Sequence, residues 1–235
     1  MRISRTVFLS LMVLVLAGCS APAKKAAPAP KANRVGVISL LPSELSYQKF
    51  GVTKFNNEVT SRPVGDVFNV AARAGAQSAL RMSGRSVIQL DVDVPTMTRH
   101  VQSYPGSLEV KVEQIEEEVQ ALVKEHKLDA VVLMVETIEK DKPIKGIRVV
   151  VRAGIGYVDK AEIMPHFAML ALDKNGKQLS MVGVTSSYPA NRADNAPWVY
   201  ILAENLDAPT HEQFTKFLQT AIESEAEQGV MSLSF

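Results

Sequence analysis

The sequence has little of several features that would point to a function. Its 235 residues include a single cysteine, which excludes a disulfide framework and a cysteine-based zinc site. The 26 lysines and arginines balance 25 aspartates and glutamates, so net charge gives no reason to expect nucleic acid as a partner. Aromatic residues make up only 6% of the chain, but 46% of it is hydrophobic, which is enough aliphatic material for a packed core.

A long hydrophobic run is also missing. The longest, Val7–Gly18, has twelve residues, whereas a membrane-spanning helix needs about 20. Arg2 and Arg5 precede this run, and a short positive head followed by a short apolar stretch is typical of a signal peptide. We therefore predict a signal peptide over residues 1–18.

The apolar run ends in Leu16-Ala17-Gly18-Cys19, a stretch that resembles the lipobox of bacterial lipoproteins. The resemblance implies cleavage before Cys19, a diacylglyceryl thioether on its sulfur and a further acyl chain, such as palmitate, on its new amine. Several acyl chains anchor a protein stably, which one chain does not. Ser20, where aspartate would imply inner-membrane retention, implies an outer-membrane address. An ordinary secretory signal with a chance cysteine is the alternative.

The next segment, 20–33, reads SAPAKKAAPAPKAN. Alanine, proline and lysine cannot bury enough apolar surface to order themselves, so we predict a disordered tether that reaches roughly 40 Å. The acylated cysteine and tether together occupy 19–33, and the folded domain occupies 34–235. Removal of Arg2 and Arg5 with the signal peptide leaves 24 basic against 25 acidic side chains.

Hydrophobic periodicity predicts a mixture of strands and helices in the folded domain. We expect strands at 34–40, 47–53, 86–94, 129–138, 147–158, 166–172 and 177–187, helices at 66–82, 108–127 and 210–229, and a short strand at 230–235. Asn175-Gly176 favours a hairpin turn. The helix before residue 129 favours a crossover between parallel neighbours, and the strands from 147 to 187 favour an antiparallel meander. The prediction is one α/β or α+β domain with a mixed sheet and about three helices.

The order of these elements carries a second resemblance. His126-Lys127-Leu128-Asp129-Ala130-Val131 leads from a helix into an apolar strand. This arrangement resembles the small α/β domain of envelope lipoproteins, such as the curli secretion lipoprotein and the lipoproteins that activate penicillin-binding proteins. The resemblance covers residues 34 to 228 by element order, and no functional motif carries over residue by residue.

The residues offer little catalytic chemistry. Ser46-Tyr47-Gln48-Lys49 matches the SxxK pattern of serine acyltransferases, but its companion SxN and KTG patterns are absent. Asp91 and Asp93 would share one face of a strand and would serve a cation only with a third carboxylate, whereas the alternation favours a solvent-exposed face. Gly154-Ile155-Gly156 lacks the third glycine of a nucleotide loop, and the four histidines have no metal-ligand spacing. We expect no metal and no cofactor.

The stretch Pro189–Pro209 is the least regular and contains Trp198, the only tryptophan. Long irregular segments of compact domains are usually functional or mobile. Arg192, Trp198 and Tyr200 are of the residue types that most often dominate interfaces, so they are the candidate partner contact. The alternative is that Trp198 and Tyr200 close the edge of the core.

These features predict a lipoprotein anchored in the outer membrane by the acyl chains on Cys19. Its domain would face the periplasm as a non-catalytic binding or assembly module of an envelope complex. Two alternatives stay open. A periplasmic hydrolase acting on cell-wall or lipid material requires a pocket with convergent polar groups and a strongly shifted pKa. A carrier of a small hydrophobic ligand requires a closed apolar cavity.

Overall fold

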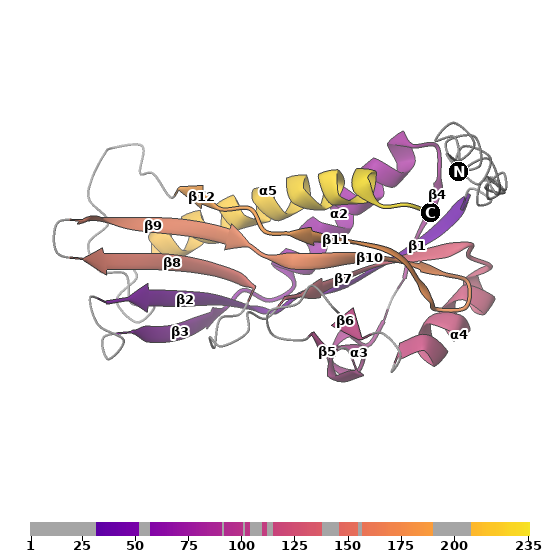
Figure 1. Ribbon diagram of the computed structural model, residues 1–235, viewed down its shortest axis with the longest axis horizontal. Helices are drawn as coiled ribbons and strands as arrows, with labels where there is room; N and C mark the ends of the chain where they lie inside the picture. Colours follow the sequence, from indigo (N-terminus) through magenta and orange to yellow (C-terminus); the bar gives the residue numbers. More distant parts are fainter. Residues whose placement is uncertain are drawn as a thin grey trace, which may run out of the picture. The chain divides into compact units, whose positions relative to one another are not determined.

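Two mixed sheets of five strands each form the frame of the domain (Figure 1). The structure is a computed structural model, and it describes residues 32–51, 57–90, 92–100, 102–103, 110–111, 115–137, 146–154, 157–189 and 208–235. All of these belong to one compact unit that begins at Lys31. The predicted fold class, a single α/β domain with mixed strand directions, is confirmed.

The first sheet, called sheet A, has the strand order β11-β10-β7-β1-β4. β1 runs parallel to both of its neighbours, β4 and β7, while β10 runs antiparallel to β7, the central strand, and to β11. The bounds are Arg34–Leu40 for β1, Ser86–Gln89 for β4, Ala130–Glu136 for β7, Phe167–Asp173 for β10 and Gln178–Val184 for β11.

The second sheet, called sheet B, has the strand order β12-β9-β8-β2-β3. Its pair β2 and β8 is parallel, and the other neighbours are antiparallel. The bounds are Glu44–Phe50 for β2, Glu58–Pro63 for β3, Ile147–Gly154 for β8, Tyr157–Pro165 for β9 and Tyr188–Pro189 for β12. A separate pair joins β5 (Gln102–Ser103) to β6 (Val110–Lys111).

The chain passes repeatedly from one sheet to the other in the same lateral order. β1 leads into β2, β7 into β8, β9 into β10 and β11 into β12, so four strands of each sheet connect directly to a strand of the other, while β3 and β4 are joined through α2. The first passage is held by Asn69: its side-chain oxygen accepts from the Leu41 N–H at 2.9 Å and its amide donates to the Leu41 carbonyl at 3.0 Å. The two sheets therefore meet along one line, where the chain passes from a strand of one sheet into a strand of the other.

Four helices cover this frame among the described residues. α2 (Val67–Met82) and α5 (Ala208–Ser232) lie on one face, and α3 (Val94–His100) and α4 (Glu116–His126) lie on the other face of sheet A (Figure 1). α2 and α5 approach closely at Gly75, where an added Cβ would lie 2.0 Å from the Glu223 carbonyl oxygen. Only glycine allows this crossing without moving a backbone.

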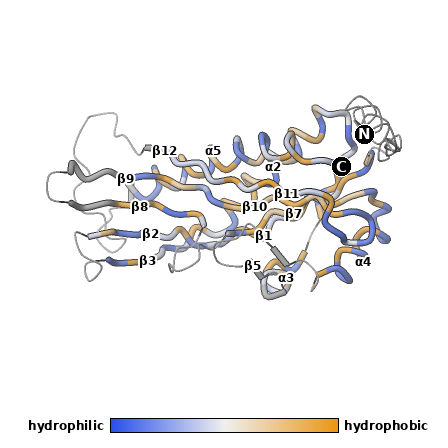
Figure 2. The backbone as a smooth tube through the Cα atoms, in the orientation of Figure 1, coloured by the Kyte–Doolittle hydropathy of each residue, from blue (hydrophilic) through white to orange (hydrophobic). Residues whose placement is uncertain are grey.

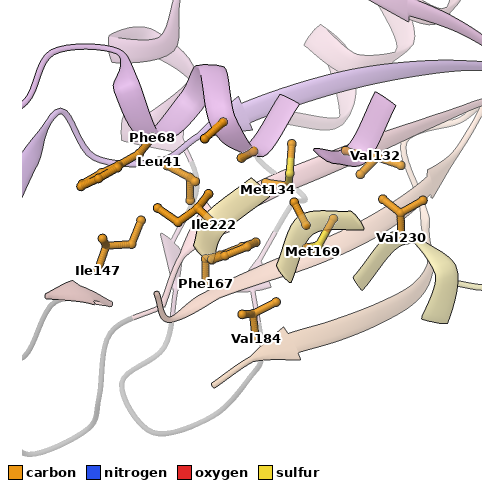
Figure 3. Close-up of a cluster of buried hydrophobic side chains, with 14 of the residues drawn as sticks. Leu41, Phe68, Val132, Met134, Ile147, Phe167, Met169, Val184, Ile222 and Val230 are labelled. Carbon is orange, nitrogen blue, oxygen red and sulfur yellow. The ribbon is translucent and has the colours of Figure 1, made fainter. Parts of the chain in front are cut away.

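The larger hydrophobic cluster lies between the two sheets and the pair α2 and α5. Figure 3 shows strand residues such as Met134, Phe167 and Met169 pointing toward Phe68 of α2 and Ile222 of α5. A second cluster fills the other face of sheet A, where Leu133 and Leu170 meet residues of α3 and α4. Figure 2 shows hydrophobic residues along these central strands, as expected for strands that are buried on both faces.

Several predicted details are confirmed. The strand at 34–40 is β1 with the predicted bounds, and the helix at 66–82 is α2, which starts one residue later. The predicted turn at Asn175-Gly176 joins β10 to β11: Gly176 has φ +77°, and the Asp173 carboxylate accepts from the Asn175 and Lys177 N–H groups.

Other details were wrong. The strand predicted at 86–94 ends at Gln89, because Asp93 caps a helix, α3, where a loop was expected. β4 and β7 are parallel but are not neighbours, since β1 lies between them. The strands from 147 onward are antiparallel, yet they divide between the two sheets instead of forming one meander.

The C-terminal prediction also needs correction. α5 begins at Ala208, before the predicted start at 210, and it continues past Gly229 to Ser232. Gly229 does not end the helix but allows it to approach Met169 of β10, whose sulfur would lie 2.3 Å from an added Cβ. The apolar end at 230–235 is therefore the last turn of this helix and a short tail, not a strand.

Candidate functional site

A crevice opens where the two sheets meet, at the carboxyl ends of β1 and β7. It encloses about 700 Å³ and is lined by Leu40 and Val135 at the strand ends, by the start of α2 and by the start of α3. β1 has one parallel neighbour on each side, and the crossing helices α2 and α4 lie on opposite faces. In open α/β sheets ligands bind at this kind of reversal in strand order, beyond the carboxyl ends of the strands.

Apolar walls and acidic groups share the crevice. Leu40, Leu41, Pro42, Val94, Pro95 and Val135 supply the apolar surface, and Glu44, Asp66 and Glu136 supply carboxylates. Asp66 lies at the start of α2, where a carboxylate complements the helix dipole, and it pairs with Arg73 at 2.7 Å. Glu44 accepts a hydrogen bond from the Ser61 hydroxyl at 2.8 Å.

The crevice has the size and composition of a small-molecule site. Among the described residues that line it, none is a histidine, cysteine, lysine or arginine. The buried Asn69 amide, which also lines it, is committed on both atoms to the backbone of Leu41. Its rim residues, including Ser43 and Glu44, are exposed, so the crevice is open to solvent and is not a closed cavity.

A second hollow, of about 480 Å³, lies on the outer surface of α5 beside β12. Phe217 stands at its edge with 43% of its surface exposed. The Phe217 ring packs edge-on against Tyr188, with 5.9 Å between ring centroids. Lys216, Thr220 and Ser224 add polar groups around this pair. We call this the α5 patch: Tyr188, Gln213, Lys216, Phe217, Thr220, Ala221 and Ser224.

Tyr188 is fixed from the side of α5. Its hydroxyl donates to the Glu225 carboxylate in a short hydrogen bond. Partial burial, the bond to Glu225 and the negative charge of that residue all raise the pKa of the Tyr188 hydroxyl. The phenol therefore remains protonated, and it presents the ring as a rigid aromatic surface.

The third polar feature joins α5 to sheet B. The Tyr47 hydroxyl of β2 donates to Nδ1 of His211 at 2.5 Å, and the rings lie 6.0 Å apart. Burial lowers the pKa of His211, nearby Arg62 lowers it further, and a hydrogen bond to the Pro63 backbone opposes both. Burial likewise raises the pKa of Tyr47, against the effect of Arg62. The pair is thus a neutral imidazole and a neutral phenol.

This pair has the form of a general acid and base, but its location does not suit catalysis. Tyr47 is only 2% exposed and packs against Phe214 inside the larger cluster. A reacting group needs direct or one-water access to its substrate, and the Tyr47 hydroxyl lies among core side chains. The arrangement instead fixes the start of α5 against β2 and β3.

The residues predicted to act lie outside the described part of the chain. These are the lipidation residue Cys19 and the candidate contacts Arg192, Trp198 and Tyr200. Their roles remain predictions. The described structure ends at Pro189 on one side of the candidate contact segment and resumes at Ala208, the first residue of α5. The α5 patch therefore lies at the elements that flank this segment in the chain.

The structure also tests the weaker candidates from the sequence, where it describes their residues. Ser46 and Lys49 lie on a strand, three residues apart, so their side chains point to opposite faces and cannot act as a serine and lysine pair. Asp93 caps α3 by accepting hydrogen bonds from Thr96, and Asp91 lies outside the described residues. Nowhere in the described part do three or more potential ligands cluster to hold a metal ion.

None of the four histidines was a candidate from the sequence. His211 is nevertheless half-buried, and its Nδ1 lies 2.5 Å from the Tyr47 hydroxyl. The crevice was missed because its residues come from separate elements and form no local pattern. The α5 patch was missed for another reason: a phenylalanine at helical spacing predicts a core position, whereas Phe217 is 43% exposed.

Within the described residues, no helix combines the length and the apolar character needed to cross a membrane. Neither the family models nor the curated proteins contain a match to the sequence. Two solved structures are similar in part. A dodecamer of PelC from Paraburkholderia phytofirmans, carrying one substitution, is 11% identical with a TM-score of 0.31, over 85% of this chain and 91% of that one. The lipoprotein GNA1162 from Neisseria meningitidis is 11% identical with a TM-score of 0.33, over 80% and 96%. Such low values assign no family and no function to this chain.

Proposed function

We propose that this chain is an outer-membrane lipoprotein, held by acyl chains on Cys19, whose domain binds a protein partner on the periplasmic side without catalysing a reaction. The lipobox Leu16-Ala17-Gly18-Cys19 supports the anchor. The observation that supports the binding role is the α5 patch, where the exposed Phe217 packs on the half-buried Tyr188 beside a hollow on the surface of a long helix.

The α5 patch has the chemistry of an interface. Large aromatic side chains in a hollow are the usual anchors of protein contacts, and Lys216 places a positive charge beside them. A complementary partner presents an apolar side chain next to a carboxylate. The predicted contacts Arg192, Trp198 and Tyr200 belong to the segment that joins β12 to α5. We propose that they contact the same partner.

The first test concerns the anchor. Cys19→Ser removes the only thiol of the chain, so labelled palmitate should no longer be incorporated and the protein should leave the membrane fraction. Continued membrane association of this variant in full, with no acyl label in the unaltered chain, would exclude the lipoprotein assignment.

The second test concerns the patch. A photoreactive amino acid at Thr220 of the lipidated full chain should give one protein cross-link in cells, and Phe217→Ser should remove most of it. Met231→Ser is the matched control, since Met231 is exposed on the same helix but outside the patch. The partner should also bind less well to Lys216→Glu. Equal cross-linking by Phe217→Ser and Met231→Ser would argue against the patch.

The crevice favours one alternative, a carrier of a small ligand. Its apolar walls suit an uncharged hydrophobic molecule, although its rim is open. The neutral dye N-phenyl-1-naphthylamine should then bind saturably. Thr98→Trp, which fills the crevice, should abolish binding, whereas Ala74→Trp on exposed α2 surface should not. The hydrolase alternative has less support, because the imidazole of acid and base form, His211, is bonded to the buried Tyr47 hydroxyl among core side chains.

A further inference from the structure

The helices α2 and α5 end beside the residue at which the predicted tether joins the domain. Arg85, which follows α2, donates from Nε to the Ala32 carbonyl oxygen at 3.2 Å, and its guanidinium lies 4.5 Å from the ring centre of Phe235, which follows α5. The Ser86 N–H donates to the Asn33 carbonyl oxygen at 2.8 Å. Figure 1 shows both helices ending here, beside the starts of β1 and β4. We call this region the tether end: residues 32–34, 81–86 and 231–235.

Two methionines of the tether end are strongly exposed. Met82 exposes 64% of its surface and Met231 exposes 62%, the two highest values among the large hydrophobic residues that the structure describes. Met82 is the last residue of α2, and Met231 is the last but one of α5. The helices cross where Gly75 meets the backbone of Glu223 and Glu227, and each continues from that crossing to its methionine. Both therefore present a flexible apolar side chain to whatever lies against the tether end.

The charged side chains of the tether end are all basic. They are Arg34, Arg81 and Arg85, and the three segments that form this end contain no aspartate or glutamate. The tether residues that precede them, 20–31, add three lysines and no acidic residue. The carboxylate of the neighbouring Asp129 is occupied, because it accepts from two backbone N–H groups at the start of β1 at 2.9 Å. The tether end therefore combines positive charge with exposed apolar side chains.

A phospholipid surface fits this combination. Lipid phosphates accept hydrogen bonds from arginine, and the boundary between head groups and acyl chains accepts apolar side chains. The length of the tether favours this occupant, because only twelve residues separate Cys19 from Ala32. Such a segment reaches at most about 37 Å when it is extended. A contact between the tether end and the membrane is then intramolecular in effect, so even a weak contact is populated.

We propose that the tether end docks on the phospholipid surface in which Cys19 is anchored. Met82 and Met231 enter the boundary between the head groups and the acyl chains. The guanidinium groups of Arg34 and Arg81 contact lipid phosphates. This inference rests on the proposed lipid anchor, and it adds a second contact between the chain and the membrane. Docking limits the directions in which the α5 patch can face, because the patch lies on the same helix as Met231.

Fluorescence quenching by lipids tests the docking on the complete lipidated chain. The chain is reconstituted in vesicles of phosphatidylethanolamine and phosphatidylglycerol, and Met82→Cys or Met231→Cys supplies a thiol for the fluorophore NBD. The acyl thioether leaves Cys19 without a free thiol, so each protein carries one label. Lipids with a nitroxide near the head-group end of the acyl chain should quench both labels by more than about half.

Val59→Cys is the matched control, because Val59 is also an exposed hydrophobic residue, at 52%, but lies on β3 of sheet B. The strand that pairs with β3, β2, follows the carboxyl end of β1, whereas the tether joins the amino end of β1. The Val59→Cys label should lose less than about a tenth of its fluorescence, because a nitroxide within the bilayer does not reach it. The labels at the two methionine positions should also emit at shorter wavelength than this control.

A change of charge gives an independent readout. Arg81→Glu on the Met231→Cys background should lower the quenching at least about twofold, because phosphatidylglycerol repels the new carboxylate. Lys216→Glu makes the same change of charge about 22 Å from Met231 along α5, so it should leave the quenching unchanged. Phosphatidylcholine in place of phosphatidylglycerol should weaken the quenching as Arg81→Glu does. All of these positions are exposed, so the variants should fold.

Quenching of the two methionine-position labels that is no greater than that of the Val59→Cys label would overturn the docking. Labels shielded from water but not quenched by the nitroxide lipids would also overturn it, and would place a protein surface there instead. Equal quenching in the Arg81→Glu and Lys216→Glu chains would remove the contact with lipid phosphates. The anchor is measured separately, by recovery of the chain with the vesicles, and the partner contact by the cross-link at Thr220, so failure of the docking leaves the proposed function testable.

Discussion

Sheets A and B are connected by strands that lead from one sheet into the other, but they differ in the side chains that their faces bury. The central strands of sheet A are buried along almost their whole length between two hydrophobic clusters. Sheet B has one face in the larger cluster, and its other face carries buried polar side chains: Ser46, Gln48 and Arg148. Sheet A forms an apolar core, whereas sheet B contains buried polar groups and the hydrogen bond between Tyr47 and His211.

This difference follows from the helices. α2 and α5 cover the first face along both sheets, but the helices of the second face, α3 and α4, pack against sheet A. Strands covered by helices on both faces are apolar throughout, whereas β2 alternates apolar and polar residues although both sets are buried. Stability is therefore concentrated in sheet A, and the features that can bind or respond lie on sheet B, on the outside of α5 and at the line where the sheets meet.

The largest expected effect tests the core role of sheet A. Leu133→Ala on β7 leaves a cavity in the second cluster and should lower the free energy of unfolding by about 2–5 kcal/mol. Leu179→Ala, the same change at a half-exposed position of β11, should cost less than about 0.5 kcal/mol. Urea denaturation followed by circular dichroism measures both. Equal losses would mean that burial in sheet A does not set stability.

A smaller effect concerns the helix pair that both sheets share. Gly75→Ala places a methyl group against the Glu223 carbonyl and forces α2 and α5 apart. Overpacking of about 1–3 kcal/mol exceeds the gain in helix propensity of about 1 kcal/mol, so the variant should be less stable than the unaltered chain. Ala74→Ser, at the exposed neighbouring position, should change little. A more stable Gly75→Ala protein would show that the helices can separate freely.

The same contrast explains which elements could be predicted. β1, β7 and β10 are continuous apolar runs, and such runs predict buried strands without knowledge of the fold. β3 was missed because its sequence, EVTSRP, mixes charged and polar residues around one valine. β9 was also missed: the predicted strand at 147–158 runs past the end of β8 at Gly154, and no strand was predicted over most of Tyr157–Pro165.

The sites were harder to predict than the strands. The crevice takes its walls from residues near 40, 66, 95 and 135, which are brought together only by the order of strands in sheet A. The Tyr47 and His211 contact joins residues 164 positions apart. Local propensity does not contain such pairings, because they depend on which strands become neighbours. The stretch that resembles a lipobox is contiguous, so the prediction of lipidation needed the sequence alone.

The third expected effect is a pH dependence of stability that arises from His211, at the contact between α5 and sheet B. The pKa of His211 is lowered in the folded state by burial first and by Arg62 second. Unfolded His211 has an ordinary pKa near 6.5, so the unfolded state binds more protons below that pH. The contribution of His211 to stability is full above pH 6.5 and declines as the pH falls toward its folded pKa.

His211→Gln tests this expectation, since glutamine can accept from Tyr47 but does not titrate. The variant should lose less stability than the unaltered chain between pH 7.5 and pH 5, as measured by urea denaturation at each pH. Thr215→Ala, one turn further along α5, is the control that should keep the full pH dependence. Identical pH dependence in the unaltered and His211→Gln chains would assign the acid sensitivity to other groups.

The smallest expected effect is a gain in the free energy of unfolding. It comes from a comparison of two buried hydroxyls, one in each sheet. Ser39 of β1 is fully buried, and its Oγ has no hydrogen-bond partner among the described residues. Ser46 of β2 is also buried, but its Oγ accepts from the Gln48 amide at 3.4 Å. A buried hydroxyl without a partner costs free energy, whereas one with a partner contributes to stability.

Ser39→Ala should therefore raise the free energy of unfolding by about 1 kcal/mol, and Ser46→Ala should lower it by about 0.5–1.5 kcal/mol. Both substitutions remove one oxygen from a buried strand, so volume and propensity nearly cancel in the comparison. The opposite signs would show that sheet A tolerates polar atoms only at a cost, whereas sheet B uses them in its polar face. Stabilisation by both substitutions would instead make the polar face of sheet B as costly as the hydroxyl in sheet A.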